Sequence, residues 1–181
     1  MTQELIENLL KKFPDTIRSV NVDTARREFS VQVEAPKIVE VARYLHDAPE
    51  AAFDHITDIC SADYPSDQER FEVIYHLLSL PHGHRIRLKA RLREEHATIP
   101  SVTGIWRGAE FLEREVYDMM GISFTGHPDL RRILMPEDYA EGYPLRKDFP
   151  AEGRGWRSHF DFIPRLDEPP VEMTEIGRAH V

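Results

Sequence analysis

The chain contains very little cysteine: Cys60 is the one such residue among 181. A single cysteine forms no intramolecular disulfide, and iron–sulfur clusters are ordinarily held by several cysteine thiolates. Cys60 follows an apolar stretch, so we interpret it as a small buried hydrophobic residue. The chain alone therefore lacks the ligands for an iron–sulfur cluster.

Long apolar runs and an excess of positive charge are missing as well. No apolar stretch approaches the roughly 20 residues that a helix needs to cross a bilayer. The N-terminus resembles neither a secretory signal nor a transit peptide. The formal net charge is −9, and this disfavours a general nucleic-acid role because phosphate binding needs a basic surface. These absences predict a soluble, cytoplasmic bacterial protein.

Nucleotide-binding and nucleophile motifs are absent too. The sequence has no G-x-G-x-x-G fingerprint, no G-x-x-x-x-G-K-[ST] loop and no G-x-S-x-G elbow. Most oxidoreductases bind a nucleotide or a metal cofactor, so a free-standing redox enzyme is disfavoured.

Hydrophobic periodicity predicts an α+β fold with an antiparallel sheet and helices packed on one face. Gly121 is expected to end the last helix. The predicted helices cover residues 3–13, 37–48 and 105–120, and the predicted strands cover 16–22, 28–34, 51–60, 70–80 and 84–93.

The amino-acid composition changes after residue 120, where seven of the 13 prolines lie. Such prolines favour an extended backbone that makes few hydrogen bonds. We therefore divide the chain into an α+β core domain (1–120), an extended docking segment (121–165) and a tail (166–181). The final residues, EIGRAHV, match an in-frame translation of a common sequencing-adapter read-through. We hypothesise that they are artefactual, that the natural chain differs or continues after about Thr174, and we exclude them from the fold prediction.

Residues 113–150 form the most informative block. Charges of both signs are mixed there with Gly, Pro, Tyr and Phe, without the period of a self-contained helix or strand. Its aromatic and aliphatic residues argue against disorder. A turn-rich segment of this length is expected to lie over another surface.

An acidic cluster at the start of this block invites a catalytic interpretation. Glu113, Glu115 and Asp118 lie close to Arg114, and paired carboxylates can perform general acid–base chemistry. On a helix, however, Glu113 and Glu115 are about 200° apart. Glu110 and Arg114 have the stabilising i,i+4 order, so we favour an ion-paired surface or interface helix.

Three histidines are candidates for metal or catalytic groups. His82 and His84 flank a glycine at a hairpin tip, but zinc needs further ligands and none is close in sequence. We interpret the pair as an exposed turn. His127 precedes Pro128, where we expect a structural hydrogen bond.

One predicted strand has a basic face and an apolar face. Of three interpretations, we favour a solvated face paired with acidic residues such as Glu72, followed by a protein partner and then nucleic acid. The basic residues are Arg85, Arg87, Lys89, Arg91 and Arg93, and the apolar ones are Ile86, Leu88, Ala90 and Leu92.

The block from Glu113 to Pro150 resembles the signature of the 30 kDa subunit family of respiratory complex I. Its bacterial members are the corresponding subunits of the proton-pumping NADH:quinone oxidoreductase. Tyr143 and Phe149 depart conservatively from the family, which commonly has His and Tyr there. The resemblance covers roughly residues 5–165. The matching pieces include Glu113-Arg114-Glu115, Tyr117-Asp118, Gly121-Ile122, Gly126-His127-Pro128, Leu130-Arg131-Arg132-Ile133-Leu134, and the run from Gly142 to Pro150. Further matches lie upstream at Phe53-Asp54, Asp58-Ile59, Asp63-Tyr64-Pro65 and Ile99-Pro100-Ser101-Val102.

This resemblance implies a place in a large assembly. Family members belong to the peripheral arm near the quinone-reducing module, on the cytoplasmic side of the bacterial inner membrane. They contact the 49 kDa-type subunit and neighbouring iron–sulfur subunits. The resemblance implies that FMN and the iron–sulfur clusters lie in partner subunits, and that the isolated chain is inactive.

The resemblance also implies an interface role for the signature residues. We expect no catalytic residue, no cofactor-binding residue and no metal ligand in this chain. We predict that charged side chains of the docking segment fix its register on the partner, while Leu130, Ile133, Leu134, Tyr143 and Phe149 provide apolar contacts. On this basis Arg146→Ala would impair arm assembly more than it destabilises the domain. The predicted interface residues are Glu113, Arg114, Glu115, Asp118, His127, Arg131, Arg132, Arg146, Lys147 and Asp148.

Three alternatives remain. The chain could be the equivalent subunit of a membrane-bound hydrogenase or of a dehydrogenase with another electron donor. It could be a stand-alone hydrolase that uses Glu113, Glu115 or Asp118 with His127. It could also bind nucleic acid through residues 84–93, which predicts salt-sensitive binding.

Overall fold

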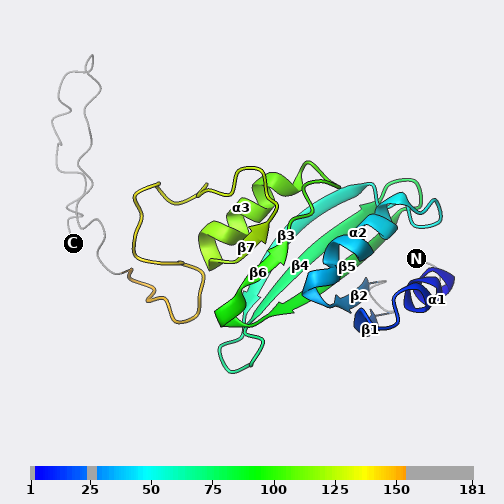
Figure 1. Cartoon of the computed structure of the whole chain (residues 1–181), viewed down its shortest axis with the longest axis horizontal. Coiled ribbons are helices and arrows are strands. Elements are labelled where there is room, and N and C mark those ends of the chain that lie inside the picture. The colour runs from blue at the N-terminus through cyan, green and yellow to red at the C-terminus, as the bar shows by residue number, and fades with distance from the viewer. Residues whose placement is uncertain (1–2, 24–27, 154–181) are drawn as a thin grey trace, which may run out of the picture.

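A computed structural model describes residues 3–23 and 28–153. The chain forms a five-stranded sheet with the helices α2 (Ile38–Asp47) and α3 (Ala109–Met120) on one of its faces (Figure 1). A third helix is α1 (Gln3–Lys12), and short 3-10 turns lie at Ala35–Lys37 and Glu94–His96. The strands of this sheet are β1 (Ile17–Asp23), β2 (Glu28–Val33), β3 (His55–Asp63), β4 (Phe71–Ser79) and β5 (His84–Leu92).

The strand order is β1-β2-β5-β4-β3. The pairs β1–β2, β3–β4 and β4–β5 are antiparallel, as expected for hairpin-connected strands. The pair β2–β5 is parallel. It is the pair at which the β1–β2 strands meet the edge of the β3–β4–β5 meander. The α+β class with helices on one face is confirmed, and this parallel pair is the one departure from a fully antiparallel sheet.

A second, two-stranded sheet was not predicted. It pairs β6 (Thr98–Pro100) in parallel with β7 (Ser123–Thr125). Strands of three residues are too short to show a hydrophobic period. Because β7 lies beyond residue 121, the first residues of the docking segment are joined to the core by backbone hydrogen bonds.

The start of β3 differs from the prediction. Residues 51–54 continue the turn that follows α2: the Ala52 N–H donates to Ala48 O, the Phe53 N–H donates to Leu45 O, and Ala52 has a positive φ of 42°. Ala51 and Phe53 are buried, but they lie in a turn and not in a strand. The apolar run therefore predicted burial correctly and the start of the strand wrongly, since β3 begins at His55.

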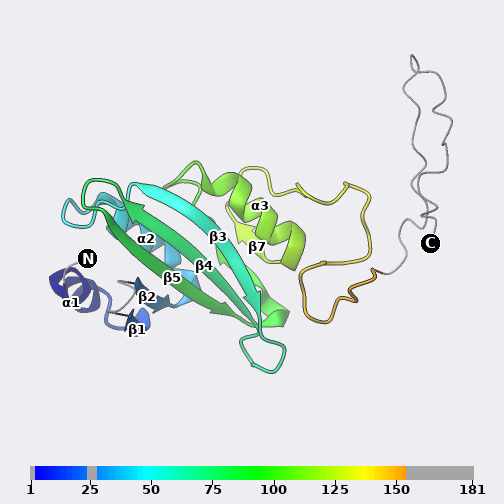
Figure 2. The same cartoon turned by 180° about the vertical axis from the view of Figure 1, so that it is seen from behind.

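The core fills the space between the sheet and the helices. Alternating inward residues of β4 and β5, among them Val73, Tyr75, Leu88 and Ala90, are at most 1% exposed. They meet the apolar side of α2, including Ile38 and Leu45. Figure 2 shows the opposite face of the sheet, over which no described helix passes. No helix among the described residues is long and apolar enough to span a membrane.

Candidate docking surface

The helix α3 ends at Gly121, as predicted. Gly121 is left-handed with φ 73°, and its N–H donates to Tyr117 O at 2.9 Å. Three charged residues of this helix are buried: Glu113 and Asp118 are 0% exposed and Arg114 is 5% exposed. The surface part of the interpretation of α3 as an ion-paired surface or interface helix is therefore wrong for these three residues, while Asp118 does form an ion pair, with Arg132.

Glu115 is exposed, on the opposite side of the helix from Glu113. This agrees with the separation of about 200° that helical geometry gives for residues two apart. Arg114 contacts the docking segment, where its Nε donates to Arg131 O at 3.1 Å and its Nη2 to Arg132 O at 2.9 Å.

Asp118 binds the residues that follow. Its Oδ2 accepts the backbone N–H groups of Ile133, Leu134 and Met135 at 3.0, 2.8 and 2.8 Å. Its Oδ1 accepts Nη1 of Arg132 at 2.7 Å. Arg114 and Asp118 lie one helical turn apart, so α3 holds residues 131–135 through their carbonyls and their N–H groups together.

These bonds determine the ionisation of Asp118. Burial opposes the charged form, but the hydrogen bonds from the three backbone N–H groups and from Arg132 outweigh it and lower the pKa of the Asp118 carboxyl below its ordinary value. The group is therefore a carboxylate at neutral pH, and this form makes the strong charge-assisted hydrogen bonds.

A second attachment fixes residues 145–148. The Leu145 N–H donates to Met119 O at 3.1 Å and Arg146 Nε donates to Met120 O at 2.8 Å. The Arg146 guanidinium also lies over the ring of Phe71, 4.8 Å from its centroid. The docking segment is thus held against the C-terminal end of α3 and the start of β4.

A third attachment joins the same region to the turn between β3 and β4. Asp63 and Arg70 form a two-point ion pair with distances of 2.7 and 2.9 Å. The Lys147 N–H donates to Asp63 Oδ2 at 2.7 Å, and Asp148 pairs with Arg70 at 3.0 Å. Residues 63 and 70 were not among the predicted interface residues, and only the folded turn brings them to the docking segment.

Several charged side chains of the docking segment therefore bind groups of the chain's own core. Arg132, Arg146 and Asp148 use in-chain partners for bonds that were predicted to join another subunit. Arg131 pairs with its neighbour Asp129 at 2.8 Å and stays exposed. Because Arg146 bonds within the chain, Arg146→Ala would also loosen this chain, so it does not isolate an assembly defect.

Apolar side chains of this region point outward instead. Ile133 is 37% exposed, and Phe111, Leu134 and Leu145 are 58–59% exposed. Ile133 and Leu134 are bonded through their backbone to Asp118, and Leu145 to Met119. All four therefore lie on α3 or on chain bonded to it, and we call them the outer apolar residues.

The other predicted apolar contacts divide between the core and solvent. Leu130 is partly buried against the core. Tyr143 is half-buried, with the guanidinium of Arg146 4.6 Å from its ring centroid. Phe149 is half-buried as well. Only Ile133 and Leu134 of the predicted set remain exposed to a partner.

His127 has the structural role expected for it. Its Nδ1 accepts the Asp129 N–H at 3.0 Å, so Nε2 carries the proton and donates to Glu110 O at 3.0 Å. Glu113 and Asp118 are buried and hydrogen-bonded. Glu115 is exposed, but both ring nitrogens of His127 are engaged in hydrogen bonds. The histidine that the hydrolase alternative needs is therefore occupied, and the described residues give that alternative no support.

Glu113 has an unusual environment. Its two oxygens accept hydrogen bonds from Ser101 Oγ and from the Val102 N–H, both at 2.7 Å. Burial is the larger effect and raises the pKa of the Glu113 carboxyl to about 7. Glu113 therefore connects α3 to the loop after β6 in a form that depends on pH near neutrality.

Two of the five basic residues of the predicted strand, Lys89 and Arg91 of β5, are paired with acidic residues as predicted. Lys89 binds Glu72 at 3.0 Å, and Arg91 binds Glu72 at 3.3 Å and Asp67 at 3.1 Å. These ion pairs support the interpretation as a solvated, paired face. At the hairpin tip, the rings of His82 and His84 are stacked with their centroids 5.7 Å apart, and His82 is exposed.

Cys60 is not the buried hydrophobic residue that the sequence indicated. It is half-buried, and its Sγ lies 3.8 Å from Nε2 of His76. Its side chain lies close to that of Asp58, on the face of the sheet opposite the helices. This group was not predicted because it depends on the pairing register of β3 with β4.

An α+β domain that fixes its own C-terminal segment with charges and turns apolar side chains outward has the character of a component of a larger assembly. Comparison with known proteins gives the same class. Residues 31–155 match the family described as "Respiratory-chain NADH dehydrogenase, 30 Kd subunit". The chain belongs to this family and is a subunit of the NADH-quinone oxidoreductase enzyme complex.

Curated relatives are similar in sequence to this chain over most of its length. An NADH-quinone oxidoreductase subunit of Roseiflexus sp. (strain RS-1) is 48% identical over 146 residues, which cover 81% of this chain and 82% of the relative. Its counterpart in Paramagnetospirillum magneticum is 42% identical, covering 99% of this chain and 90% of the relative.

Two solved structures share the fold. The trypsin-resistant fragment (1–134) of Nqo5 is 33% identical with a TM-score of 0.59, over 71% of this chain and 98% of the fragment. A chain of the membrane-bound sulfane sulfur reductase, an archaeal respiratory membrane complex, is 25% identical with a TM-score of 0.65, over 93% of this chain and 98% of that chain.

Proposed function

We propose that this chain is a structural subunit of the peripheral arm of the oxidoreductase and docks on the 49 kDa-type subunit of the quinone module through its outer apolar residues. Electrons from NADH would pass through FMN and iron–sulfur clusters on other subunits to quinone. In this proposal the chain carries none of those carriers and lies on the cytoplasmic side of the bacterial membrane.

One observation carries the proposal. The docking segment is held to the core by its charged groups and its backbone, while Ile133, Leu134 and Leu145 remain exposed. Full burial of such a side chain is worth about 1.5–3 kcal/mol. These three side chains are already about half buried, so together they would contribute roughly 2–5 kcal/mol before the cost of association, which is several kcal/mol or more, and the proposal therefore needs further contacts such as Phe111. Fixing the segment in advance lowers that cost.

Substitution of the outer apolar residues tests this role. Leu134→Asp and Leu145→Asp place a charge where the proposal puts an apolar contact, without altering a described in-chain side-chain bond. We expect much less assembled complex in native gels of detergent-solubilised membranes, with an unchanged melting temperature of the purified chain. Leu80→Asp is the matched control, because Leu80 is 64% exposed at the β4–β5 turn. Normal assembly in both variants, or equal loss in the control, would contradict the proposal.

The identity of the partner needs a direct readout. A photoreactive phenylalanine analogue in place of Leu134 is expected to crosslink to the 49 kDa-type subunit in intact membranes, as identified by mass spectrometry. The same analogue in place of Leu80 is the control. Crosslinking of Leu134 to another subunit would refute the proposed partner while leaving the docking role intact.

A second candidate is the equivalent subunit in a respiratory complex that uses another electron donor. The shared fold with a chain of the archaeal sulfane sulfur reductase complex favours it. Affinity purification of the tagged chain from membranes in mild detergent separates the two. Flavin absorbance together with NADH-dependent quinone reduction supports the first proposal, and a complex that is inactive with NADH supports the second.

A further inference from the structure

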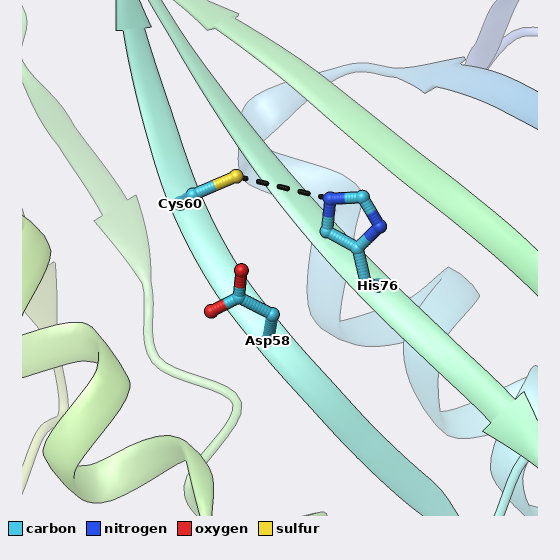
Figure 3. Close-up of side chains that lie close together, drawn as sticks. All are labelled: Asp58, Cys60 and His76. Atoms are coloured by element: carbon cyan, nitrogen blue, oxygen red, sulfur yellow. Dashed lines mark hydrogen bonds between the residues drawn. The ribbon is translucent and has the colours of Figure 1, made fainter.

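Three potential metal ligands meet on the face of the sheet opposite the helices. Asp58 and Cys60 lie on β3, His76 lies on β4, and their ligand atoms are all within 4.8 Å of one another (Figure 3). Asp58 is exposed, while Cys60 and His76 are half-buried. No side chain of this group takes part in the docking-segment contacts described above.

A bulge in β3 brings Asp58 into the group. Ile56 faces the core, so strict alternation would turn Asp58 inward as well. The pairing with β4 shifts register between Ile56 and Asp58, and as a result Asp58 is exposed beside its partner His76. Bulges commonly turn a side chain toward a functional site. Cys60 then follows two residues later on the same face.

The distances suit a small tetrahedral ion. For zinc bonds of about 2.3 Å to sulfur and 2.05 Å to nitrogen, tetrahedral geometry places the two ligand atoms about 3.6 Å apart. Cys60 Sγ and His76 Nε2 are 3.8 Å apart. A carboxylate oxygen of Asp58 lies within 4.8 Å of both atoms, and it must approach them further to reach the third position.

The ligand chemistry selects among metals. Magnesium and calcium prefer oxygen ligands alone, whereas a thiolate, an imidazole and a carboxylate together suit zinc. A thiolate and a carboxylate carry two negative charges, which match a divalent cation. Of the nearby cations on β5, Lys89 is paired with Glu72 at 3.0 Å. Arg87 lies opposite His76 and opposes cation binding, so the affinity is expected to be moderate.

We propose that Asp58, Cys60 and His76 form a zinc site that links β3 to β4, with a water molecule as the fourth ligand. The site lies on the opposite face of the sheet from the helices, so it is independent of the docking proposal. A bound zinc ion would join the neighbouring strands β3 and β4. The strand β3 ends at Asp63, which accepts the hydrogen bond from Lys147 of the docking segment.

Metal titration of the full-length chain tests the site. We expect one zinc per chain by calorimetry, and with cobalt a sulfur-to-metal charge-transfer band that reports the thiolate ligand. Cys60→Ser should abolish that band, and Cys60→Ser and His76→Gln should each weaken zinc binding by at least about tenfold, since even the loss of a second-shell partner costs 10–100-fold. Asp58→Asn should weaken it less, because that side chain is exposed.

Controls separate this site from the other eight of the chain's nine histidines. His84→Gln changes a histidine at the hairpin tip and should leave zinc binding unchanged. Zinc should also raise the melting temperature of the wild-type chain but not of Cys60→Ser, whose fold is checked by circular dichroism. Unchanged affinity in a folded Cys60→Ser variant, or loss of binding in His84→Gln, would overturn the proposal. Assembly of the complex is a separate measurement and does not decide it.

Discussion

Arg70 meets Asp63 through two parallel hydrogen bonds, Nε to Oδ1 at 2.7 Å and Nη2 to Oδ2 at 2.9 Å. The Asp63 side chain is 0% exposed and that of Arg70 is 10% exposed. The same two side chains bind the Lys147 N–H and the Asp148 carboxylate. One buried ion pair thus closes the β3–β4 turn and fixes residues 147–148 of the docking segment.

Removing one member of this pair should be severely destabilising. Asp63→Asn removes the main partner of Arg70, which keeps only the more exposed carboxylates of Glu94 and Asp148, so we expect a loss near the lower end of the roughly 3–5 kcal/mol that breaking a buried ion pair costs. The measurement is urea unfolding of the purified chain. Asp67→Asn is the control, because Asp67 pairs with Arg91 in an exposed ion pair and should lose at most about 1 kcal/mol. Equal effects of the two substitutions would contradict the structural role of Asp63.

Asp118 should control access to residues 131–135. Asp118→Asn removes the charge that binds Arg132 and weakens three backbone hydrogen bonds. Hydrogen bonds to a charged group contribute about 1.5–3 kcal/mol, so local opening should become roughly tenfold to hundredfold more frequent. Trypsin should then cleave faster after Arg131 and Arg132. Asp129→Asn alters only an exposed ion pair with Arg131 and should leave the cleavage rate near that of wild type.

Gly121 allows the docking segment to pack closely on the end of α3. A Cβ built there would overlap the ring of Tyr143 and lie 2.7 Å from Arg146 Nη2. Gly121→Ala should therefore displace residues 143–146 and lower stability by more than the roughly 1–2 kcal/mol that left-handed backbone alone costs. Gly126→Ala is the matched control: its φ is +84° and nothing lies within 4 Å of the added Cβ. Melting temperatures that fall equally in both variants would show that the Tyr143 contact is unimportant.

Glu113 should make stability depend on pH near neutrality. Its pKa is about 7 in the folded chain, against an ordinary value of 4.5. Between these values the folded state binds the extra proton, so this group's contribution to stability falls as pH rises from about 4.5 to 7 and is constant above. At about 1.4 kcal/mol per pH unit, the change is on the order of 3 kcal/mol.

The comparison of wild type with Glu113→Gln isolates this contribution. Gln does not titrate, so the difference in unfolding free energy, wild type minus variant, should decline from about pH 5 to about pH 7 and then level off. Glu115→Gln, at an exposed position of the same helix, should show no such slope. A difference that rises with pH would mean that the Ser101 and Val102 hydrogen bonds, rather than burial, determine the ionisation of Glu113.

Local pattern predicted much of the fold. Each of the three helices and five long strands was expected near its observed place, although β3 begins at His55 instead of 51 and α3 at Ala109 instead of 105. Gly121, with its left-handed backbone, follows the end of α3 as expected. The three-residue strands β6 and β7 carry too short a pattern to be found. The last part of the predicted docking segment (154–165) and the predicted tail (166–181), with its final EIGRAHV, lie outside the described residues.

The sequence by itself determined the class of protein, because the signature from Glu113 to Pro150 needs no folding to be read. It also indicated that this block lies on another surface. Only the tertiary structure decided which surface. Charge alone does not say whether Arg132 and Arg146 bind a partner or their own core, since that depends on which carboxylates and carbonyls the fold brings within reach. Asp118, Met120 and the pair Asp63–Arg70 are brought there by the packing of α3 and by the β3–β4 register, so the charges turn inward and Leu134 and Leu145 remain outside.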